Sequence, residues 1–336
     1  MDDRHVSLAH GNGGRLMREL IDEVFATRLS NPELDTEADA VPIVLDGGDG
    51  SIMITTDGFI VQPLEYPGGD IGALAVHGTV NDLAVAGAVP KFLSVNAFIE
   101  EGLEIALLER LVASMAAAAR EAGVSIVAGD TKVLQRGEGG GVYFATTGIG
   151  IRPAGLSVGT ETIQPGDALL VSGPVGDHGT AVMLAREQFG LRGELRSDSA
   201  SVLPLTQALI GLHGLRFMRD PTRGGLATVA HDLVRATGFA VRLEENAIPV
   251  RDQVQSVCDM LGYDPYYLAC EGRVVAVTSS DAAEAALKQW RALPDGADAA
   301  LIGRFTGDAA RVVLETRIGG ERVLPELEDD PLPRIC

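Results

Sequence analysis

The spacing of apolar and polar residues predicts strands and helices that alternate along the first half of the chain. After a glycine-rich opening, a helix-like segment extends to about Leu29. Two longer helices are expected, one buried over 71–87 and one alanine-rich over 104–122. The strands predicted in this half cover 51–56, 91–98, 124–128 and 142–150. Such alternation favours a layered α+β or α/β fold over a helical bundle.

The second half repeats this alternation after a crossing segment at 151–164. A strand at 167–172 is followed by the glycine-rich loop 173–179 and a helix, a context that suits either anion binding or a plain tight turn. Residues 219–225 lead into another helix, for which Thr222 is the expected cap. The alternation continues to about Thr316.

The length of 336 residues indicates two domains, because a single core rarely serves so long a chain. The last thirteen residues contain three prolines and five charged residues, which indicates an extended, mobile tail. The expected organisation is a glycine-rich segment and helix, an ATP-binding and dimerisation domain, an α/β domain and a flexible tail, at 1–35, 36–152, 153–318 and 319–336.

Charge and cysteine content narrow the possible functions. The formal net charge of −20 disfavours nucleic acid as a partner, because the surface would repel phosphates. Three separated cysteines provide neither a disulfide framework nor a tetrahedral zinc site. The start of the chain has no signal region, and polar residues interrupt its most apolar stretch, 71–89. We therefore expect a cytoplasmic protein that does not enter the membrane.

Five aspartates share one placement, at or near a glycine- or threonine-flanked end of an apolar element: Asp49, Asp57, Asp82, Asp130 and Asp220. Carboxylates that meet in one cleft repel each other unless cations are present. Mg²⁺ accepts oxygen ligands from carboxylates and from nucleotide phosphates together. The chain has no P-loop motif and only three lysines, so metal would have to neutralise bound ATP. The alternative is that these are ordinary turn and cap aspartates.

Three further features have a functional and a structural interpretation. The loop 10–14, which includes Gly13 and Gly14, could cover phosphates with its backbone amides or be an ordinary glycine-rich loop. Lys132, two residues after Asp130, could orient a phosphoryl group or form a surface ion pair. Glu271 could be a desolvated base or a turn carboxylate.

Cys336 ends the sequence on the expected mobile tail. It is not positioned for prenylation, which requires a cysteine four residues from the end. A thiol on a mobile arm is an accident, a site of intermolecular pairing or a covalent carrier. At about 3.3 Å per residue, the arm from Pro325 could reach roughly 35–40 Å, enough to visit a neighbouring cleft.

Several motifs together closely resemble the carbamoyl dehydratase family of nickel–iron hydrogenase maturation, over essentially the whole chain. They are residues 7–14, 55–58, 67–72, 78–90, 129–132, 176–179, 219–225 and the closing Pro333-Arg-Ile-Cys336. The closing motif is the most specific. The aspartate motifs also resemble those of aminoimidazole ribonucleotide synthetase, selenophosphate synthetase and thiamine-monophosphate kinase.

The resemblance implies a two-domain fold similar to aminoimidazole ribonucleotide synthetase, with the first domain forming a homodimer. It implies that a carbamoyltransferase loads Cys336, that ATP drives dehydration of the carbamoyl group to a thiocyanate, and that cyanide passes to an iron-bearing maturation scaffold. The five aspartates would hold Mg²⁺ and nucleotide, while Lys132 and Glu271 would handle protons.

Two other functions remain open. One is a related enzyme that phosphorylates a small molecule and does not need the terminal thiol. The other is a non-catalytic carrier or scaffold that uses Cys336 for docking.

Overall fold

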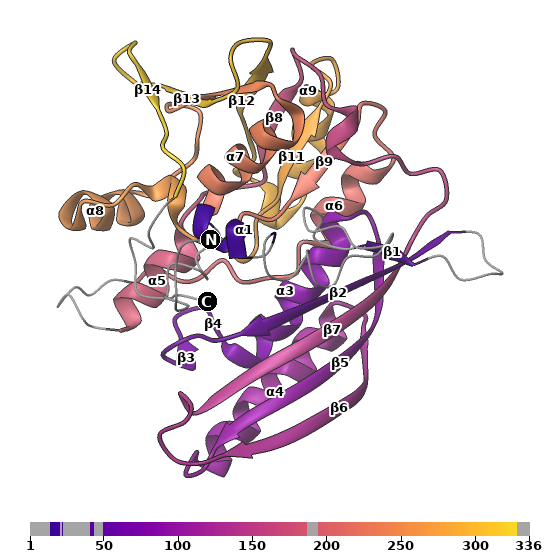
Figure 1. The fold of residues 1–336 in the computed structure, drawn as a ribbon, viewed down its shortest axis with the longest axis vertical. Coiled ribbons are helices and arrows are strands. Elements are labelled where there is room, and N and C mark those ends of the chain that lie inside the picture. Colours follow the sequence, from indigo (N-terminus) through magenta and orange to yellow (C-terminus); the bar gives the residue numbers. More distant parts are fainter. Residues whose placement is uncertain (1–13, 21, 23–40, 44–49, 187–193, 328–336) are drawn as a thin grey trace.

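The computed structural model describes residues 14–20, 22, 41–43, 50–186 and 194–327, which form two main sheets with their helices (Figure 1). The first sheet has five strands in the order β1-β2-β7-β5-β6, and α3 and α4 cover one of its faces. Its strands are β1 (Val41–Ile43), β2 (Ser51–Phe59), β5 (Val89–Glu100), β6 (Ser125–Leu134) and β7 (Val142–Arg152). Its helices are α3 (Ile71–Val85) and α4 (Ile105–Glu121).

The second sheet has seven strands in the order β14-β13-β10-β12-β8-β11-β9. The strands are β8 (Ala168–Val171), β9 (Leu215–Arg219), β10 (Ala240–Glu244), β11 (Val275–Thr278), β12 (Ala300–Thr306), β13 (Val312–Glu315) and β14 (Glu321–Val323). The main helices around it are α6 (Leu203–Ile210), α7 (Gly225–Thr237) and α9 (Ala283–Arg291).

Shorter elements connect these layers. They are α1 (Arg15–Leu20), β3 (Glu65–Tyr66), β4 (Gly69–Asp70), α5 (Asp177–Ala185) and α8 (Asp252–Leu261), with 3-10 turns at Thr160–Thr162, Pro265–Tyr267 and Pro294–Gly296. Asp70 caps the start of α3, because its side chain accepts hydrogen bonds from two amides of the first turn.

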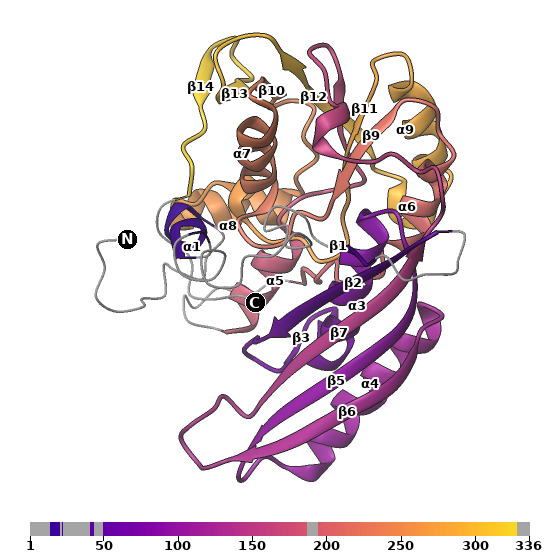
Figure 2. The same ribbon diagram turned by 45° about the vertical axis from the view of Figure 1, so that its right-hand side comes forward.

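The two sheets differ in how much of their surface is covered. Every residue of β8 and of β11 is buried, because α7 packs on one face of the second sheet and α6 and α9 pack on the other. In the first sheet, β6 is exposed along nearly its whole length, and it forms the outer edge in both views (Figures 1 and 2). The face of the first sheet opposite α3 and α4 therefore has no cover in the described part of the chain.

Helix α3 lies between the two halves and is buried along almost all of its length. Its apolar side chains contribute to the core with β2 and β7, while Ala84 and Val85 pack with residues of α6 and α9. Because α3 packs against both halves, most of its positions are apolar. His77, Asn81 and Asp82 are the polar exceptions on this helix. No helix among the described residues is long and apolar enough to cross a membrane.

The predicted elements are largely present, but three local expectations are wrong. Strands β2 and β6 run through Asp57 and Asp130, so these aspartates lie within strands rather than after them. Thr222 does not cap α7: the N-cap is Gly224, in a left-handed conformation that suits glycine. The third wrong expectation is that the flexible tail begins at residue 319. Residues 321–323 instead pair with β13, and Leu324 is fully buried, because an apolar side chain there completes the core.

Candidate active site

A pocket of about 120 Å³ lies between the two halves of the molecule and collects acidic side chains from both. Its lining residues come from β2, α3 and two loops of the second half: Asp57, Gly58, Phe59, Ile60, Gly78, Asp82, Asp220, Thr222, Arg223 and Glu271. Four of the predicted functional residues therefore meet here although they are up to 214 positions apart in the sequence (271 − 57).

The first half supplies Asp57 from β2 and Asp82 from the last turn of α3. The two elements pack closely because Gly78 has no side chain: a Cβ there would lie 2.6 Å from the Phe59 ring. The Thr55 hydroxyl donates a 2.8 Å hydrogen bond to Oδ2 of Asp82. This bond fixes one carboxylate oxygen of Asp82.

The second half supplies Asp220, Arg223 and Glu271. Asp220 and Arg223 belong to the loop between β9 and α7, and Glu271 belongs to the turn that precedes β11. Asp220 and Glu271 are 6% and 4% exposed, so their carboxyl groups are held inside the protein rather than on its surface. Such placement needs compensating partners or a bound cation.

The electrostatics of the pocket are governed by burial of acidic groups. Burial raises the pKa of Asp57, although Arg223 and the Gly58 amide oppose that effect. The Arg223 guanidinium lies 3.9 Å from Oδ1 of Asp57. Among the described residues that line the pocket, one is an arginine and four carry carboxyl groups, so this lining is acidic.

The pocket residues have the hard oxygen donors that Mg²⁺ prefers. Among the described residues, however, no three His, Cys, Asp or Glu side chains are arranged to hold a metal ion by themselves. Mg²⁺ is usually held by one or two carboxylates together with substrate phosphates, so the arrangement fits an ion that arrives with a nucleotide.

Asp130 and Lys132 are not part of this pocket. They lie on β6 and form a 2.7 Å ion pair with each other, with both side chains more than half exposed. The Lys132 ammonium, as hydrogen-bond donor, lowers the pKa of Asp130. Asp130 aligns with Asn96 of β5, which aligns with Ala145 of β7, which aligns with Gly58 of β2.

This register places Asp130 far from the pocket. At about 4.8 Å per strand, Asp130 is roughly 14 Å across the sheet from Gly58. Because side chains alternate between faces, Asp130 points to the face opposite the one that Asp57 shares with Asp82. Within one chain the structure therefore separates the predicted set into two groups.

Asp49, Gly13 and Cys336 lie outside the described residues. Gly14 is described and buried, at the start of α1. The last described residues are held against the 3-10 turn Pro265–Tyr267 and α1: Tyr267 donates a 2.6 Å hydrogen bond to the Pro325 carbonyl, and Arg18 pairs with Glu326. A Cβ on Gly224 would lie 3.5 Å from the Leu327 side chain, so Leu327 lies beside the loop that contributes Asp220 and Arg223 to the pocket.

Sequence reasoning did not nominate Arg223, Thr55 and Asn81 as site residues, although each falls within a motif noted above. Arg223 could have been found by asking which cation faces the acidic set. Thr55 and Asn81 act through contacts between distant segments, and no local pattern indicates these contacts. Cys258 and Cys270 are buried, and burial raises the pKa of Cys258 to about 12.

Comparison with known proteins identifies the fold. Residues 37–152 match the family model "AIR synthase related protein, N-terminal domain", and residues 164–315 match the corresponding C-terminal domain. The predicted two-domain α/β fold similar to aminoimidazole ribonucleotide synthetase is thereby confirmed.

Full-length relatives are more specific. The chain is 45% identical to the carbamoyl dehydratase HypE of Azotobacter vinelandii, over 98% of this chain and 97% of that protein. A crystal structure of the hydrogenase maturation protein HypE in complex with ATP is 42% identical, with a TM-score of 0.82, covering 99% of this chain and 100% of that one. HypE in a HypE–HypF complex has a TM-score of 0.86 at 42% identity, covering 92% of this chain and 99% of that one.

Proposed function

Because this chain belongs to the HypE family of carbamoyl dehydratases, we propose that it uses ATP to dehydrate a carbamoyl group carried on its own Cys336. The product is a thiocyanate, the source of the cyanide ligand for the iron of a nickel–iron hydrogenase. The observation that supports this function best is the interdomain pocket, in which Asp57, Asp82, Asp220 and Glu271 surround a space suited to phosphate and cation.

The reaction needs an amide oxygen to become a leaving group. The γ-phosphoryl group of ATP is transferred to the carbamoyl oxygen, and ADP leaves. The nitrogen then loses its protons as the carbon–oxygen bond breaks, so that inorganic phosphate departs and a carbon–nitrogen triple bond forms on sulfur. The carbamoyl group loses the elements of one water, and ATP becomes ADP and phosphate.

We assign different steps of this reaction to different side chains of the pocket. Asp57, Asp82 and Asp220, together with Asp49 from outside the described residues, would hold Mg²⁺ and the nucleotide phosphates. Bound Mg²⁺ would neutralise the phosphate charge and stabilise the departing phosphate. Glu271, buried at the same pocket, accepts a proton from the carbamoyl nitrogen. Gly13 and Gly14 precede α1 and cover the phosphates with their backbone.

The position of Leu327 supports delivery of Cys336 to this pocket. Leu327 lies beside Gly224, which follows Arg223 in the loop between β9 and α7, and Cys336 is the ninth residue after Leu327. At about 3.3 Å per residue, nine residues reach up to about 30 Å. The terminal sulfur can therefore enter the pocket and also extend to another protein.

The uncovered face of the first sheet supports a homodimer. Its exposed apolar side chains include Phe92 and Phe98 of β5 and Ile149 and Ile151 of β7, each between 36% and 47% exposed. Ile126, Val127 and Val133 of the edge strand β6 are 40% to 70% exposed. An apolar sheet face and an open edge of this kind mark an interface, and a second copy would cover both.

A dimer on this face also gives Asp130 and Lys132 a place in the reaction. Within one chain they point away from the pocket, toward the surface that a second copy covers. We propose that they serve the partner subunit, with Asp130 on metal and nucleotide and Lys132 on a proton or phosphoryl group near the carbamoyl group.

The remaining partners follow from the same reaction. A carbamoyltransferase loads Cys336, and the solved HypE–HypF complex supports such an encounter for this family. An iron-bearing maturation scaffold accepts the cyanide. The net charge of −20 disfavours nucleic acid, and we place the protein in the cytoplasm with these maturation proteins.

Intact mass spectrometry tests the proposed function. The protein is incubated with carbamoyl phosphate, the partner carbamoyltransferase and ATP. We expect one carbamoyl group on Cys336 and then the loss of one water, with Cys336→Ala unmodified and the buried-thiol control Cys258→Ala modified as the wild type. ATP turnover without this mass change, undiminished in Cys336→Ala, would instead indicate a small-molecule kinase. A protein without ATP turnover would be a carrier or scaffold.

A further inference from the structure

The backbone of Glu271 is held from both sides, and this fixes where its carboxyl group enters the pocket. Its amide donates a hydrogen bond to Oδ1 of Asp198, at 3.2 Å. Its carbonyl accepts a bond from the Ala200 amide at 3.3 Å and another from Nδ2 of Asn81, also at 3.3 Å. The position of this side chain therefore depends on residues far from it in sequence.

Asn81 makes three hydrogen bonds to main-chain groups of the second half. Its Nδ2 donates to the carbonyls of Ala200, at 3.0 Å, and of Glu271. Its Oδ1 accepts a 2.8 Å bond from the Val202 amide. Because a backbone carbonyl can only accept and an amide can only donate, these partners fix the orientation of the Asn81 amide. A carboxylate or an apolar side chain of similar size cannot satisfy all three.

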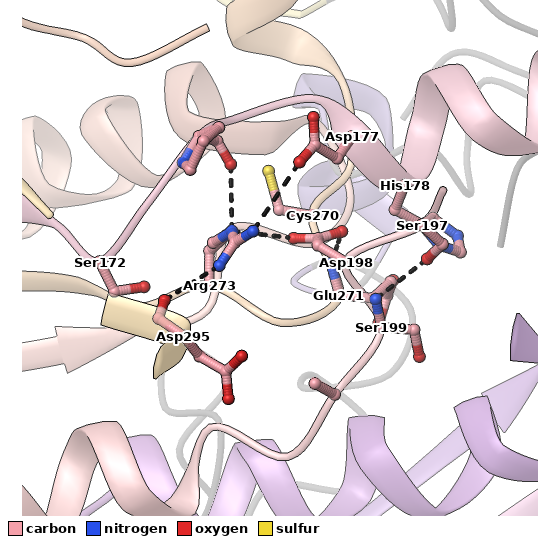
Figure 3. Close-up of polar contacts among 12 residues, drawn as sticks. Ser172, Asp177, His178, Ser197, Asp198, Ser199, Cys270, Glu271, Arg273 and Asp295 are labelled. Carbon is pink, nitrogen blue, oxygen red and sulfur yellow. Dashed lines mark hydrogen bonds and ion pairs between the residues drawn. The ribbon is translucent and has the colours of Figure 1, made fainter. Parts of the chain in front are cut away.

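The segment 198–202, which lies between α5 and α6 in the second half, contacts both Asn81 and the turn 270–273. The Asp198 side chain is 1% exposed, and its Oδ2 lies 3.4 Å from Nε of Arg273. Figure 3 shows this ion pair, with Glu271 next to it. A Cβ on Gly272 would lie 1.8 Å from the Asp198 carbonyl oxygen, so the two segments are in direct contact. The turn has little freedom to move unless segment 198–202 moves with it.

We propose that Asn81 is a positioning residue that sets the distance between the metal-binding and proton-accepting halves of the site. Asn81 precedes Asp82 on α3, and its side chain crosses the domain boundary to Glu271. One helix turn thus presents Asp82 to the phosphates and holds Glu271 at a fixed place opposite. This inference rests on the proposed function, since it assigns Asn81 a role through Glu271.

The variant Asn81→Asp tests it. The new carboxylate can still accept from the Val202 amide but faces two carbonyl oxygens, which displaces Glu271. We expect the rate of the dehydration step to fall about 100-fold, as for a misplacement of about 1 Å. The dissociation constant for ATP should stay within about twofold, because Asp57 and Asp82 remain. In a Glu271→Asp background, Asn81→Asp should lower the dehydration rate by clearly less than 100-fold, because both changes act on the same carboxyl group.

Thr206→Val is the matched control, because Thr206 is buried on α6, which packs against α3, and its hydroxyl donates a local hydrogen bond to the Leu203 carbonyl. It should leave the dehydration rate near the wild-type value. Asn81→Asp with unchanged dehydration, or with equal losses in both backgrounds, would overturn the proposal. So would loss of ATP binding that accounts for the whole effect.

Hydrogen exchange separates this inference from the proposed function. Amides of the turn 270–273 should exchange faster in Asn81→Asp, while those of β2 exchange as in the wild type. Faster exchange in a protein that never dehydrates a carbamoyl group would refute the proposed function and retain Asn81 as the support of Glu271. Unchanged exchange in the turn would refute the role of Asn81 whatever the activity.

Discussion

The acidic pocket and the Asp130–Lys132 pair contain similar residues in opposite surroundings. In the pocket, Asp220 and Glu271 are almost fully buried, and two halves of the chain contribute to one space. On β6, Asp130 and Lys132 neutralise each other in solvent on an edge strand. The first site is assembled by one chain, whereas the second has a role in the reaction only if another copy covers it.

Replacing a pocket carboxylate should have the largest effect. Asp82→Asn removes a charge that we assign to metal and phosphate, and ATP-dependent dehydration should fall about 10²- to 10³-fold. Steady-state ATP hydrolysis and mass spectrometry of the tail measure the loss. The control Asp259→Asn, on the exposed side of α8, should be as active as the wild type. Wild-type activity of Asp82→Asn would show that the pocket does not take part in the reaction.

Complementation between inactive variants distinguishes a shared site from a separate one. If Asp130 serves the partner subunit, a mixed dimer of Asp130→Asn and Asp82→Asn chains contains one intact site. In an equal, fully exchanged mixture, half of the dimers are mixed, so about a quarter of wild-type activity should return. Absence of recovery in a verified mixed dimer would show that Asp130 acts within its own chain or not at all.

Charge on the open face of the first sheet should separate the subunits. Phe92→Glu places a carboxylate where we expect apolar contact, at a cost of a few kcal/mol to the interface. Analytical ultracentrifugation should show a shift from dimer to monomer, with a parallel loss of ATP turnover. Ile318→Glu, at a side chain 96% exposed and outside this face, should remain dimeric. A wild-type monomer would refute this dimer directly.

Loss of the Thr55 hydroxyl should have a smaller effect on the pocket. Thr55→Val preserves shape but removes the 2.8 Å hydrogen bond to Asp82, and a bond to a charged group contributes about 1.5–3 kcal/mol. At the lower end of this range, we expect kcat to fall about tenfold, as measured by ATP hydrolysis. Thr56→Val, whose hydroxyl bonds to β7 instead, should change kcat much less, and equal effects would argue against a specific role for Thr55.

The last prediction concerns stability in acid and leaves the reaction near neutral pH unaffected. Burial lowers the pKa of His178 to about 3, against the ordinary value of 6.5. The unfolded chain therefore binds a proton that the folded chain refuses, and stability is lost as pH falls from about 6.5 toward 3. The loss should be up to about 1.4 kcal/mol per pH unit. Urea unfolding at several pH values should show a shallower slope for His178→Gln, while His213→Gln, at an exposed position, should match the wild type.

The sequence predicted the elements that local patterns specify. The helices at 71–85 and 105–121 follow from their apolar spacing and length. Residue type alone left the aspartates and Glu271 open as turn residues; the family resemblance grouped them, and four of them, Asp57, Asp82, Asp220 and Glu271, line one pocket. The ends of β2 and β6 were misplaced, because a pairing strand continues through glycine and aspartate when its neighbour supplies hydrogen bonds.

The sequence by itself determined which reactive side chains are available: the acidic residues, the few lysines and the thiol of Cys336. Only the tertiary structure decided which of these groups share a space. Asp130 and Asp57 occupy similar motifs, yet strand order places them about 14 Å apart on opposite faces of one sheet. The cause is that strand pairing and domain packing join residues distant along the chain, and no local pattern contains that information.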